Sequence, residues 1–225
     1  LITTYNIKVG DGIFVLSSEE LQSLQLSKSE MSLIKPFYKN SDIHRYHINL
    51  ENPQFVIYTT KDTDIDKYPR IKAHLEKFRP ILENRLRVYG EDYPWHKLHR
   101  ERDQKIFEGE KIVTSRRAEH NTFTFENQKC FEQSDITIVT KRDNTKEESK
   151  YILGLLNSVV LDFWFEHKGK LKGEAREYYF TPLSVIPIRR INFADPQEVK
   201  IHDHLVELVD SIIEAKKSLT SYNRF

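Results

Sequence analysis

The sequence predicts an α+β fold: a small mixed β-sheet wrapped by helices and followed by a long amphipathic C-terminal helix. Short runs rich in β-branched and aromatic residues predict strands, and three longer stretches carry apolar residues at helical spacing. The two kinds of element follow one another without a regular strand–helix–strand alternation, which favours α+β over a doubly wound sheet. We expect residues 1–192 to form one domain, and residues 193–225 to form a helix that packs on it or on a partner helix.

The N-terminal third is predicted to combine short strands with short capped helices. Ser17 and Ser27 each stand three residues before a glutamate, which is the pattern of a capping box at the start of a helix. In a capping box the serine hydroxyl accepts a hydrogen bond from the backbone N–H of the glutamate, and the glutamate carboxylate accepts one from the backbone N–H of the serine. Pro36 should end the second of these helices, because proline disfavours helix at the residue before it. Strands are expected at residues 12–16, 43–48 and 54–59.

Residues 68–87 are predicted to form one helix with a kink. Apolar residues recur there at helical spacing, and Pro69 fits the first turn. Pro80 should kink the helix, because proline removes a backbone donor and crowds the preceding turn. Further strands are expected at residues 111–114, 122–125, 136–140 and 185–188.

Two more helices are predicted in the C-terminal half. The first runs to about residue 166, after a third capping pattern at residues 145–148 and before Gly169 as its stop. We assign its apolar stripe to the core: Ile152, Leu155, Leu156, Val159, Val160, Phe163 and Trp164. The second opens at Asp195-Pro196, an N-cap followed by proline. Its apolar stripe consists of Ile201, Leu205, Leu208, Val209, Ile212 and Ile213.

Composition and charge exclude several classes of protein. The single cysteine, Cys130, rules out a disulfide framework and fits a reducing cytoplasm. No apolar run approaches the ~20 residues of a membrane span, no signal-peptide pattern opens the chain, and the start at Leu1 suggests a piece of a longer protein. The net charge is +1, but residues 195–215 hold −5 and the others +6. That distribution suits both an ordinary charge-balanced domain and a protein that binds DNA on one side.

The order of elements in residues 151–188 resembles one known family. An apolar helix, a Gly/Lys-rich break, an aromatic pair and a Pro-bounded strand follow one another there. This order resembles the end of the TaqI-like target-recognition domain of adenine-specific DNA methyltransferases and of fused, type IIG restriction–modification enzymes. Collinear segments extend the resemblance from about Gly12 to Ile213: Gly12–Leu16, Ile34–Tyr46, Tyr68–Ile71, His74, Leu75, Phe78, Trp95, Leu98, Arg102, Phe107, Lys111–Val113, Leu153–Ser158, Gly169–Gly173 and Ile186-Pro187.

The resemblance implies sequence-specific recognition of double-stranded DNA. The target adenine would be flipped out of the stack and presented to the protein's own N-terminal methyltransferase domain. S-adenosylmethionine would belong to that domain, and no cofactor is expected in this segment. The chain holds no Asn-Pro-Pro-Tyr-type motif and no Gly-rich nucleotide loop, so no catalytic centre is predicted in it. The bases that are read, and whether the parent protein also cleaves DNA, stay open.

Lys168, Lys170 and Lys172 are the first candidates for DNA contact. They alternate with glycines in the segment 168–173, where glycine lets a backbone approach a phosphate and lysine supplies positive charge. Lysines at the end of a helix are also favoured by the helix dipole without any ligand. The resemblance favours the DNA interpretation of these residues.

The loop at residues 95–102 is the second candidate. It combines an aromatic ring with basic and donor side chains: Trp95, His96, Lys97, Arg100 and Arg102. Arginine can pair with guanine O6 and N7, and an aromatic wedge can fill the gap left by a flipped base. The alternative, equally compatible with the sequence, is that Trp95 anchors the loop in the core.

A third candidate is the loop between two predicted strands at residues 115–121. It contributes Arg116, Arg117, His120 and Asn121, and asparagine can bridge N6 and N7 of adenine. Loops between strands are polar in most proteins, so this pattern alone is weak. Tyr178 and Tyr179 could stack on bases or sugars, although strand alternation would more often place one ring of such a pair in the core and the other outside.

No metal site and no hydrolytic centre are expected. The pairs His44/His47 and His96/His99 lack the further ligands of a tetrahedral zinc site. Residues 61–66 are acidic but lack the glycine and distant glutamate of an EF-hand. The Glu-x-Lys triplets fall on predicted helices, which do not suit a strand-borne nuclease site.

A protein-interaction module is the alternative from a different class. The C-terminal stripe with Ile201, Leu205, Leu208 and Ile212 could dock a partner helix, including that of a second copy. DNA recognition and helix docking do not exclude each other.

Overall fold

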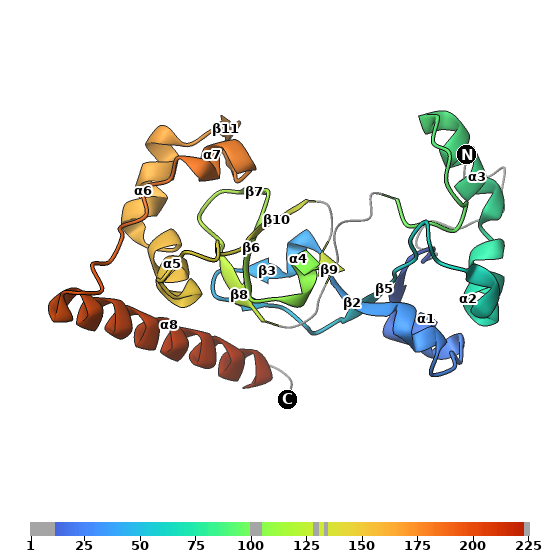
Figure 1. Cartoon of the computed structure of the whole chain (residues 1–225), viewed down its shortest axis with the longest axis horizontal. Coiled ribbons are helices and arrows are strands. Elements are labelled where there is room, and N and C mark those ends of the chain that lie inside the picture. Colours follow the sequence, from blue (N-terminus) through green and yellow to red (C-terminus); the bar gives the residue numbers. More distant parts are fainter. Residues whose placement is uncertain (1–11, 100–104, 128–130, 133–134, 223–225) are drawn as a thin grey trace. The chain divides into compact units, whose positions relative to one another are not determined.

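The computed structural model describes residues 12–99, 105–127, 131–132 and 135–222 (Figure 1). The predicted α+β class and the long C-terminal helix are confirmed. Contacts divide the chain into two compact units, residues 1–37 with 51–103 and residues 38–50 with 104–225. The boundary that we expect at residue 192 stays a prediction. Within the described ranges, no helix has the length and apolar character that crossing a membrane requires.

The first unit is built on a small antiparallel sheet. Strand β5 (Gln54–Ile57) lies between β1 (Val15–Ser17) and β2 (Ile34–Tyr38). Helix α1 (Ser18–Ser23) begins at the predicted capping box, which is confirmed: Ser17 Oγ accepts from Glu20 N at 3.2 Å, and Glu20 accepts from Ser17 N at 2.7 Å. The second predicted helix is a short 3-10 turn, η1 (Glu30–Leu33), and Pro36 lies in strand β2 after it.

The predicted kinked helix at residues 68–87 is two helices. They are α2 (Pro69–Glu76) and α3 (Arg79–Tyr89), preceded by the 3-10 turn η3 (Ile65–Lys67). Pro80 lies in the first turn of α3, where backbone N–H groups have no acceptor within the helix, so the N–H that proline lacks costs no hydrogen bond. Gly90 ends α3 with a φ of +64°. Helix α2 and the sheet bury one apolar cluster: Leu16, Ile34, Ile57, Ile65, Ile71 and Leu75.

The second unit contains the other elements of the described chain. Its smaller pieces are η2 (Asn40–Asp42), the hairpin of β3 (Ile43–His44) and β4 (His47–Ile48), α4 (Lys105–Glu108), and β9 (Phe131–Glu132). Its central sheet places β6 (Lys111–Ser115) between β8 (Thr124–Glu126) and β10 (Ile136–Val139), both antiparallel to it. A core joins this sheet to the helices: Ile112, Phe123, Leu153, Leu156, Phe165, Tyr178 and Val209.

The prediction of one continuous helix from residue 148 to 166 is wrong. Helices α5 (Ser149–Leu156) and α6 (Val159–Lys168) are separated at Asn157 and Ser158. The side-chain amide of Asn157 forms two hydrogen bonds with the backbone of Phe123. It donates to the Phe123 carbonyl at 2.8 Å and accepts from the Phe123 N–H at 3.0 Å. Ser158 Oγ caps α6 by accepting from Leu161 N at 3.2 Å. The predicted cap at residues 145–148 does not form a side-chain cap bond.

This break changes which apolar residues are buried. Val159, Val160 and Phe163, assigned to the core from the sequence, are 77%, 70% and 63% exposed. The predicted stripe requires a single helix, and the break after Leu156 rotates α6 relative to that stripe. The strand expected at residues 185–188 is also absent: the helix α7 (Phe180–Ser184) precedes this segment, which is irregular.

Helix α8 (Pro196–Tyr222) lies along α5 in the second unit (Figure 1). Its predicted N-cap is confirmed, because Asp195 Oδ1 accepts from Gln197 N at 2.8 Å. Gly154 of α5 lets the helices approach closely: a Cβ there would lie 3.0 Å from Val209 and 3.1 Å from Leu205. His202 Nε2 accepts from Glu148 N at 3.1 Å and holds the start of α8 in place.

Replacing Leu156 by Ala should lower the free energy of unfolding by about 2–5 kcal/mol, because this 3% exposed side chain lies in the main core of the second unit. Val160→Ala is the matched control. Val160 is 70% exposed, so its effect should stay within about 0.5 kcal/mol. Chemical denaturation of both variants measures the difference, and equal stabilities would contradict the break between α5 and α6.

Glu147 should make the fold sensitive to acid. Burial alone would raise the pKa of this carboxyl, but hydrogen bonds from Arg190 Nε at 2.7 Å and Ile191 N at 3.0 Å lower its pKa to about 2. A depressed pKa contributes stability that is complete above the ordinary value near 4.5 and is lost as the pH falls toward 2. Thermal melts between these pH values should show a smaller loss of stability in Glu147→Gln than in the unmodified chain; identical pH dependence would contradict the assignment.

Candidate nucleic-acid interface

A three-stranded antiparallel sheet in the second unit gathers the predicted basic residues. Strand β12 (Ala175–Glu177) lies between β11 (Leu171–Lys172) and β7 (Arg117–Ala118). The β11–β12 hairpin turns at Gly173, whose φ of +64° suits glycine. The register pairs Glu177 with Arg117 on one side, and the Glu177 N–H donates to the Lys170 carbonyl on the other at 2.8 Å.

One face of this sheet is basic. Residues directly opposite each other in an antiparallel ladder project to the same side, and alternate residues along a strand do too. Arg117, Lys170 and Lys172 therefore share a face with Glu177; we call these three cations the basic face. Glu177 lies between two of them, with Lys170 Nζ at 2.9 Å and Arg117 Nε at 3.3 Å.

The basic face holds its cations in place through a buried carboxylate. The side chain of Glu177 is only 5% exposed, whereas those of Lys170 and Arg117 are 68% and 47% exposed. The Lys170 ammonium, followed by Arg117, holds the pKa of Glu177 below its usual range, so the carboxylate stays charged. One carboxylate thus orients two exposed cations without cancelling the positive charge of the face.

Tyr179 extends the basic face. Its hydroxyl accepts from Arg117 at 3.2 Å, and the guanidinium carbons of Arg116 and Arg117 lie 5.4 Å and 6.0 Å from its ring centroid. Arginine attracted to an aromatic face in this way is held in a defined direction. The ring that reaches the surface is therefore that of Tyr179, while Tyr178 is fully buried.

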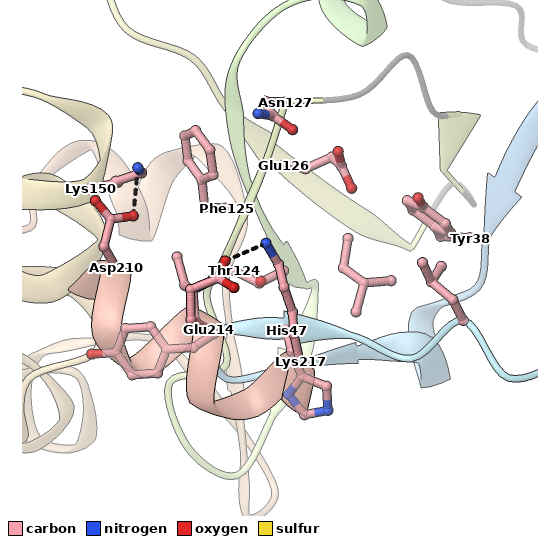
Figure 2. A pocket seen from close by; sticks show the side chains of 14 residues that line it. Tyr38, His47, Thr124, Phe125, Glu126, Asn127, Lys150, Asp210, Glu214 and Lys217 are labelled. Carbon is pink, nitrogen blue, oxygen red and sulfur yellow. Dashed lines mark hydrogen bonds and ion pairs between the residues drawn. The ribbon is translucent and has the colours of Figure 1, made fainter. Parts of the chain in front are cut away.

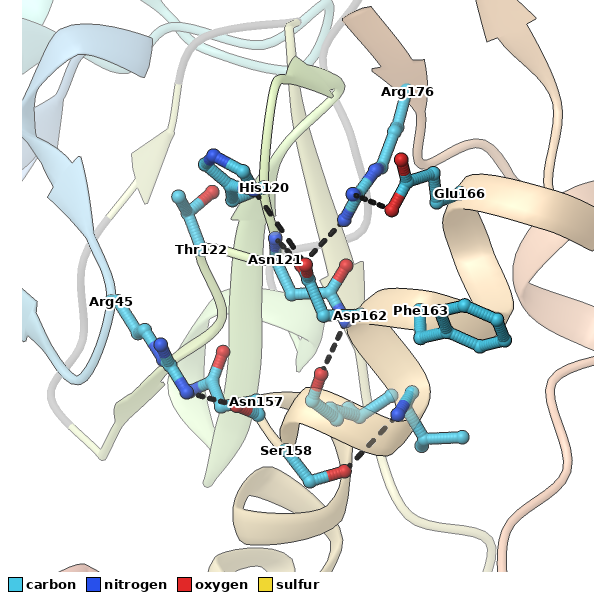
Figure 3. Close-up of polar contacts among 12 residues, drawn as sticks. Arg45, His120, Asn121, Thr122, Asn157, Ser158, Asp162, Phe163, Glu166 and Arg176 are labelled. Atoms are coloured by element: carbon cyan, nitrogen blue, oxygen red, sulfur yellow. Dashed lines mark hydrogen bonds and ion pairs between the residues drawn. The ribbon is translucent and has the colours of Figure 1, made fainter.

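The opposite face of the sheet packs on α6 through an ion pair (Figure 3). The Arg176 side chain is 5% exposed and its guanidinium lies 2.5 Å from Asp162 Oδ1, with Glu166 at 3.6 Å. Burial would raise the pKa of Asp162, but the bonds from Arg176 and from Asn121 N at 2.9 Å outweigh it and lower the pKa. His120, which is exposed, lies 3.6 Å from the same carboxylate.

Two predicted contact residues belong to this interior network. Asn121 is 2% exposed, donates to the Leu156 carbonyl at 2.6 Å and accepts from the Tyr178 hydroxyl at 2.8 Å. Burial raises the pKa of Tyr178. Because these polar groups of Asn121 and Tyr178 form hydrogen bonds inside the fold, we leave both residues out of the candidate interface. Lys168, the last residue of α6, is exposed.

The predicted loop at residues 95–102 belongs to the first unit. Trp95 packs against the apolar cluster of that unit, and the Arg79 guanidinium lies 5.0 Å from its ring. His96 is buried, its Nε2 lies 3.0 Å from the Thr63 carbonyl, and burial lowers its pKa. Lys97 is half-buried, with its ammonium 4.1 Å from the ring centroid of Tyr93. Arg100 and Arg102 lie outside the described residues.

A separate cavity of about 400 Å³ lies in the second unit, beside β4, β8 and α8 (Figure 2). Ion pairs occupy its rim, Lys150–Asp210 at 2.6 Å and Lys217–Glu214 at 2.8 Å. None of the residues predicted to contact DNA lines it. In the part of the chain that the structure describes, no three His, Cys, Asp or Glu side chains gather in a way that could hold a metal ion.

Comparison with known proteins identifies the family. The model of the TaqI-like C-terminal specificity domain matches residues 35–188, more than half of the chain. The chain belongs to this family. The predicted resemblance is thereby confirmed, and the matched residues include the whole sheet that bears the basic face.

Two curated relatives of this TaqI-like specificity domain come from Haemophilus influenzae. Type II methyltransferase M.HindII is 32% identical over 165 residues, which are 70% of this chain and 32% of that protein. Type II methyltransferase M.HincII is 32% identical over 120 residues, 53% of this chain and 24% of that protein. The chain therefore spans about a third or less of the relatives that it matches.

A solved structure shares the fold of the TaqI-like specificity domain. It is the type IIL restriction–modification enzyme MmeI in complex with DNA, with a TM-score of 0.60 and 14% sequence identity. The alignment covers 92% of this chain and 26% of that one.

The sequence did not reveal Glu177, Arg176 or Asp162 as parts of the site. Asp162 and Arg176 are 14 residues apart on different elements, a separation that follows no local periodicity. Glu177 has no local pattern that marks it, because the strand register alone places it between Lys170 and Arg117. The alternation across Tyr178-Tyr179 was a usable signal, and it correctly predicts one ring inside and one outside.

Tyr178→Phe should lower the free energy of unfolding of the TaqI-like specificity domain by about 1–3 kcal/mol, because it leaves the buried Asn121 Oδ1 without its hydroxyl donor. Tyr179→Phe is the matched control and should change stability by less than about 0.5 kcal/mol, since water can replace its half-exposed hydroxyl. Urea titrations compare the two. A larger effect at Tyr179 would show that the two faces are assigned the wrong way round.

Proposed function

We propose that this chain reads a short double-stranded DNA site on behalf of an adenine-specific DNA methyltransferase or a fused restriction–modification enzyme. The observation that carries the proposal is the basic face: three exposed cations, two of them held by a nearly buried Glu177, on the sheet of a domain that belongs to a specificity family. Two comparisons support the proposal: the relatives M.HindII and M.HincII are named type II methyltransferases, and the MmeI structure contains DNA.

The geometry of the basic face suits a DNA groove. The major groove admits a two-stranded β-ribbon, and the β11–β12 hairpin is such a ribbon with an exposed turn. Lys170 and Lys172 would contact phosphates and set the register, while Arg116, Arg117 and His120, in or beside the neighbouring strand β7, would be the candidates for contacts with base edges. Lys168 would add a further phosphate contact.

The first unit would supply a second set of contacts. Trp95 and His96 hold their loop against the unit's core, so they would act mainly by presenting the residues that follow. Lys97 is the described cation of this loop, and Arg100 and Arg102 stay predicted contacts.

Methyl transfer would take place outside this chain. The chain spans 32% of the length of M.HindII, so a methyltransferase domain of the parent protein would bind S-adenosylmethionine and receive the flipped adenine. The parent protein would work in the cytoplasm, where a chain with one cysteine stays reduced. Whether it also cuts DNA is a question for the full-length protein.

Selection from a pool of randomised duplexes at low salt tests the proposal. Enrichment of a short motif among the retained duplexes would establish a specificity domain and give its site. Retention without enrichment would show a backbone binder and would overturn sequence reading by this chain alone. Absence of retention would overturn DNA binding by it.

Substitutions on the basic face should weaken DNA binding in a salt-dependent way. Lys170→Ala and Lys172→Ala should each reduce the slope of log K against log[salt] by about 0.9, the contribution of one phosphate contact. Lys141→Ala, which removes an exposed lysine elsewhere in the second unit, is the control and should leave the slope unchanged. Fluorescence anisotropy at several salt concentrations measures the slopes; equal slopes for all three variants would remove the basic face from the interface.

Docking of a partner through the C-terminal helix is the second candidate function. It is favoured by the exposure of Ile201, Leu208 and Ile212, three residues of the predicted apolar stripe that the fold leaves 50%, 47% and 37% exposed. Such large apolar residues on one helix commonly mark an interaction surface. This function is compatible with DNA recognition.

A further inference from the structure

Helix α8 carries two apolar stripes, and the fold uses one of them. The inner stripe packs on the second unit: His202 and Val209 are 2% and 1% exposed, and Leu205 and Ile213 lie against the main core. The ion pair between Asp210 and Lys150, at 2.6 Å, fixes the middle of the helix to α5. The orientation of α8 on its own unit is therefore set along much of its length.

The second stripe lies beside the inner one on the helix and shares Leu205 with it. It contains Ile201, Leu205, Leu208, Ile212, Ala215 and Leu219, which follow one another at intervals of four, three, four, three and four residues. This alternation is the a/d pattern of a coiled coil. Four of the six are large and substantially exposed, with Leu219 at 61%, and none is polar. At 3.6 residues per turn all six fall within an arc of about 80°. We call these six residues the seam.

We infer that the seam pairs antiparallel with the seam of a second copy of this chain, with the midpoint of the overlap at the level of residue 210 along the helix axis. The six seam residues are placed symmetrically about residue 210, so their order of intervals is the same toward either end of the helix. Reversing one helix thus places Ile201 opposite Leu219, Leu205 opposite Ala215, and Leu208 opposite Ile212 of the second copy. A two-fold dimer requires such reciprocal contacts, in which residue i meets j and j meets i. The large Leu205 meets the small Ala215 at each end of the seam.

Charge favours this orientation over the parallel one. The N-terminal half of α8 is acidic, with Glu198, Asp203 and Glu207 against Lys200, whereas in the C-terminal half Asp210 and Glu214 balance Lys216 and Lys217. Lys217 is paired with Glu214 of its own chain at 2.8 Å. Antiparallel pairing brings the charge-balanced half of one helix alongside the acidic half of the other and opposes the two helix dipoles. Parallel pairing would place acidic halves side by side, which is unfavourable.

Because α8 is already folded in the single chain, a short seam is sufficient for dimerisation. An isolated helix of this kind would have to fold as it dimerised, at a cost in conformational entropy. Here α8 is already held by Val209, His202 and the Lys150–Asp210 pair, so association needs to order only exposed side chains. The inference rests on the second candidate function, docking through the C-terminal helix, and names the partner; it does not rest on the proposed reading of DNA.

Sedimentation of the whole chain over a range of concentrations tests the dimer. We expect a mass that rises on concentration from one chain to two. Leu208→Glu and Ile212→Glu should each weaken association by at least about tenfold, because a charge would be buried in the seam. Lys200→Glu is the control: it adds the same side chain to an exposed position of α8 outside the seam and should leave association unchanged. Circular dichroism melts verify that each variant folds.

Disulfide crosslinking tests the orientation. In a chain with Cys130→Ser, Leu208→Cys and Ile212→Cys are prepared separately and mixed. Antiparallel pairing predicts a mixed 208–212 disulfide as the main product, because these positions face each other. Predominant 208–208 and 212–212 products would overturn the orientation in favour of a parallel pair. A chain that stays monomeric at every concentration would overturn the second copy as the occupant of the seam, whatever the DNA selection shows.

Discussion

The ion pair between Arg176 and Asp162 is the constraint on which the candidate site depends. A guanidinium that is 5% exposed has lost most of its water, and leaving it unpaired would be strongly destabilising. Asp162 lies on α6 and Arg176 on β12, so the pair holds this strand against this helix. Because side chains alternate along a strand, fixing Arg176 inward turns Glu177 outward. The position of the basic face follows from that one buried contact.

The basic face shows how a fold can display positive charge in a defined geometry. Exposed lysines are ordinarily mobile and contribute little to specificity. Here Glu177 stands between two cations on neighbouring strands, and Tyr179 limits the directions open to Arg116 and Arg117. Cations that are ordered before binding lose less entropy when they meet a phosphate or a base edge. Such preorganisation explains how a lysine-rich segment can contribute to the recognition of a DNA sequence.

The two apolar stripes of α8 separate stability from association. Val209 and its neighbours on the inner stripe bury surface within one chain, with Gly154 allowing the close approach of α5. The seam contributes Leu205 to the core of a single chain, whereas its other large side chains, Ile201, Leu208, Ile212 and Leu219, are exposed there. A specificity domain with this arrangement could bind DNA alone and gain a second set of contacts on pairing. Avidity would then follow from two sites held at a fixed separation.

Local patterns in the sequence determined much of this protein. The capping box at Ser17, the N-cap at Asp195, the α+β class and the order of motifs that marks the TaqI-like family can all be read without coordinates, because each rests on neighbours in the chain. The tertiary structure decided what depends on distant residues. Asn157 breaks a predicted helix because its side chain pairs with the backbone of Phe123, 34 residues away, and this exposes Val159, Val160 and Phe163. Likewise only the strand register places Glu177 between Lys170 and Arg117, so the sequence could name the cations but not the carboxylate that orders them.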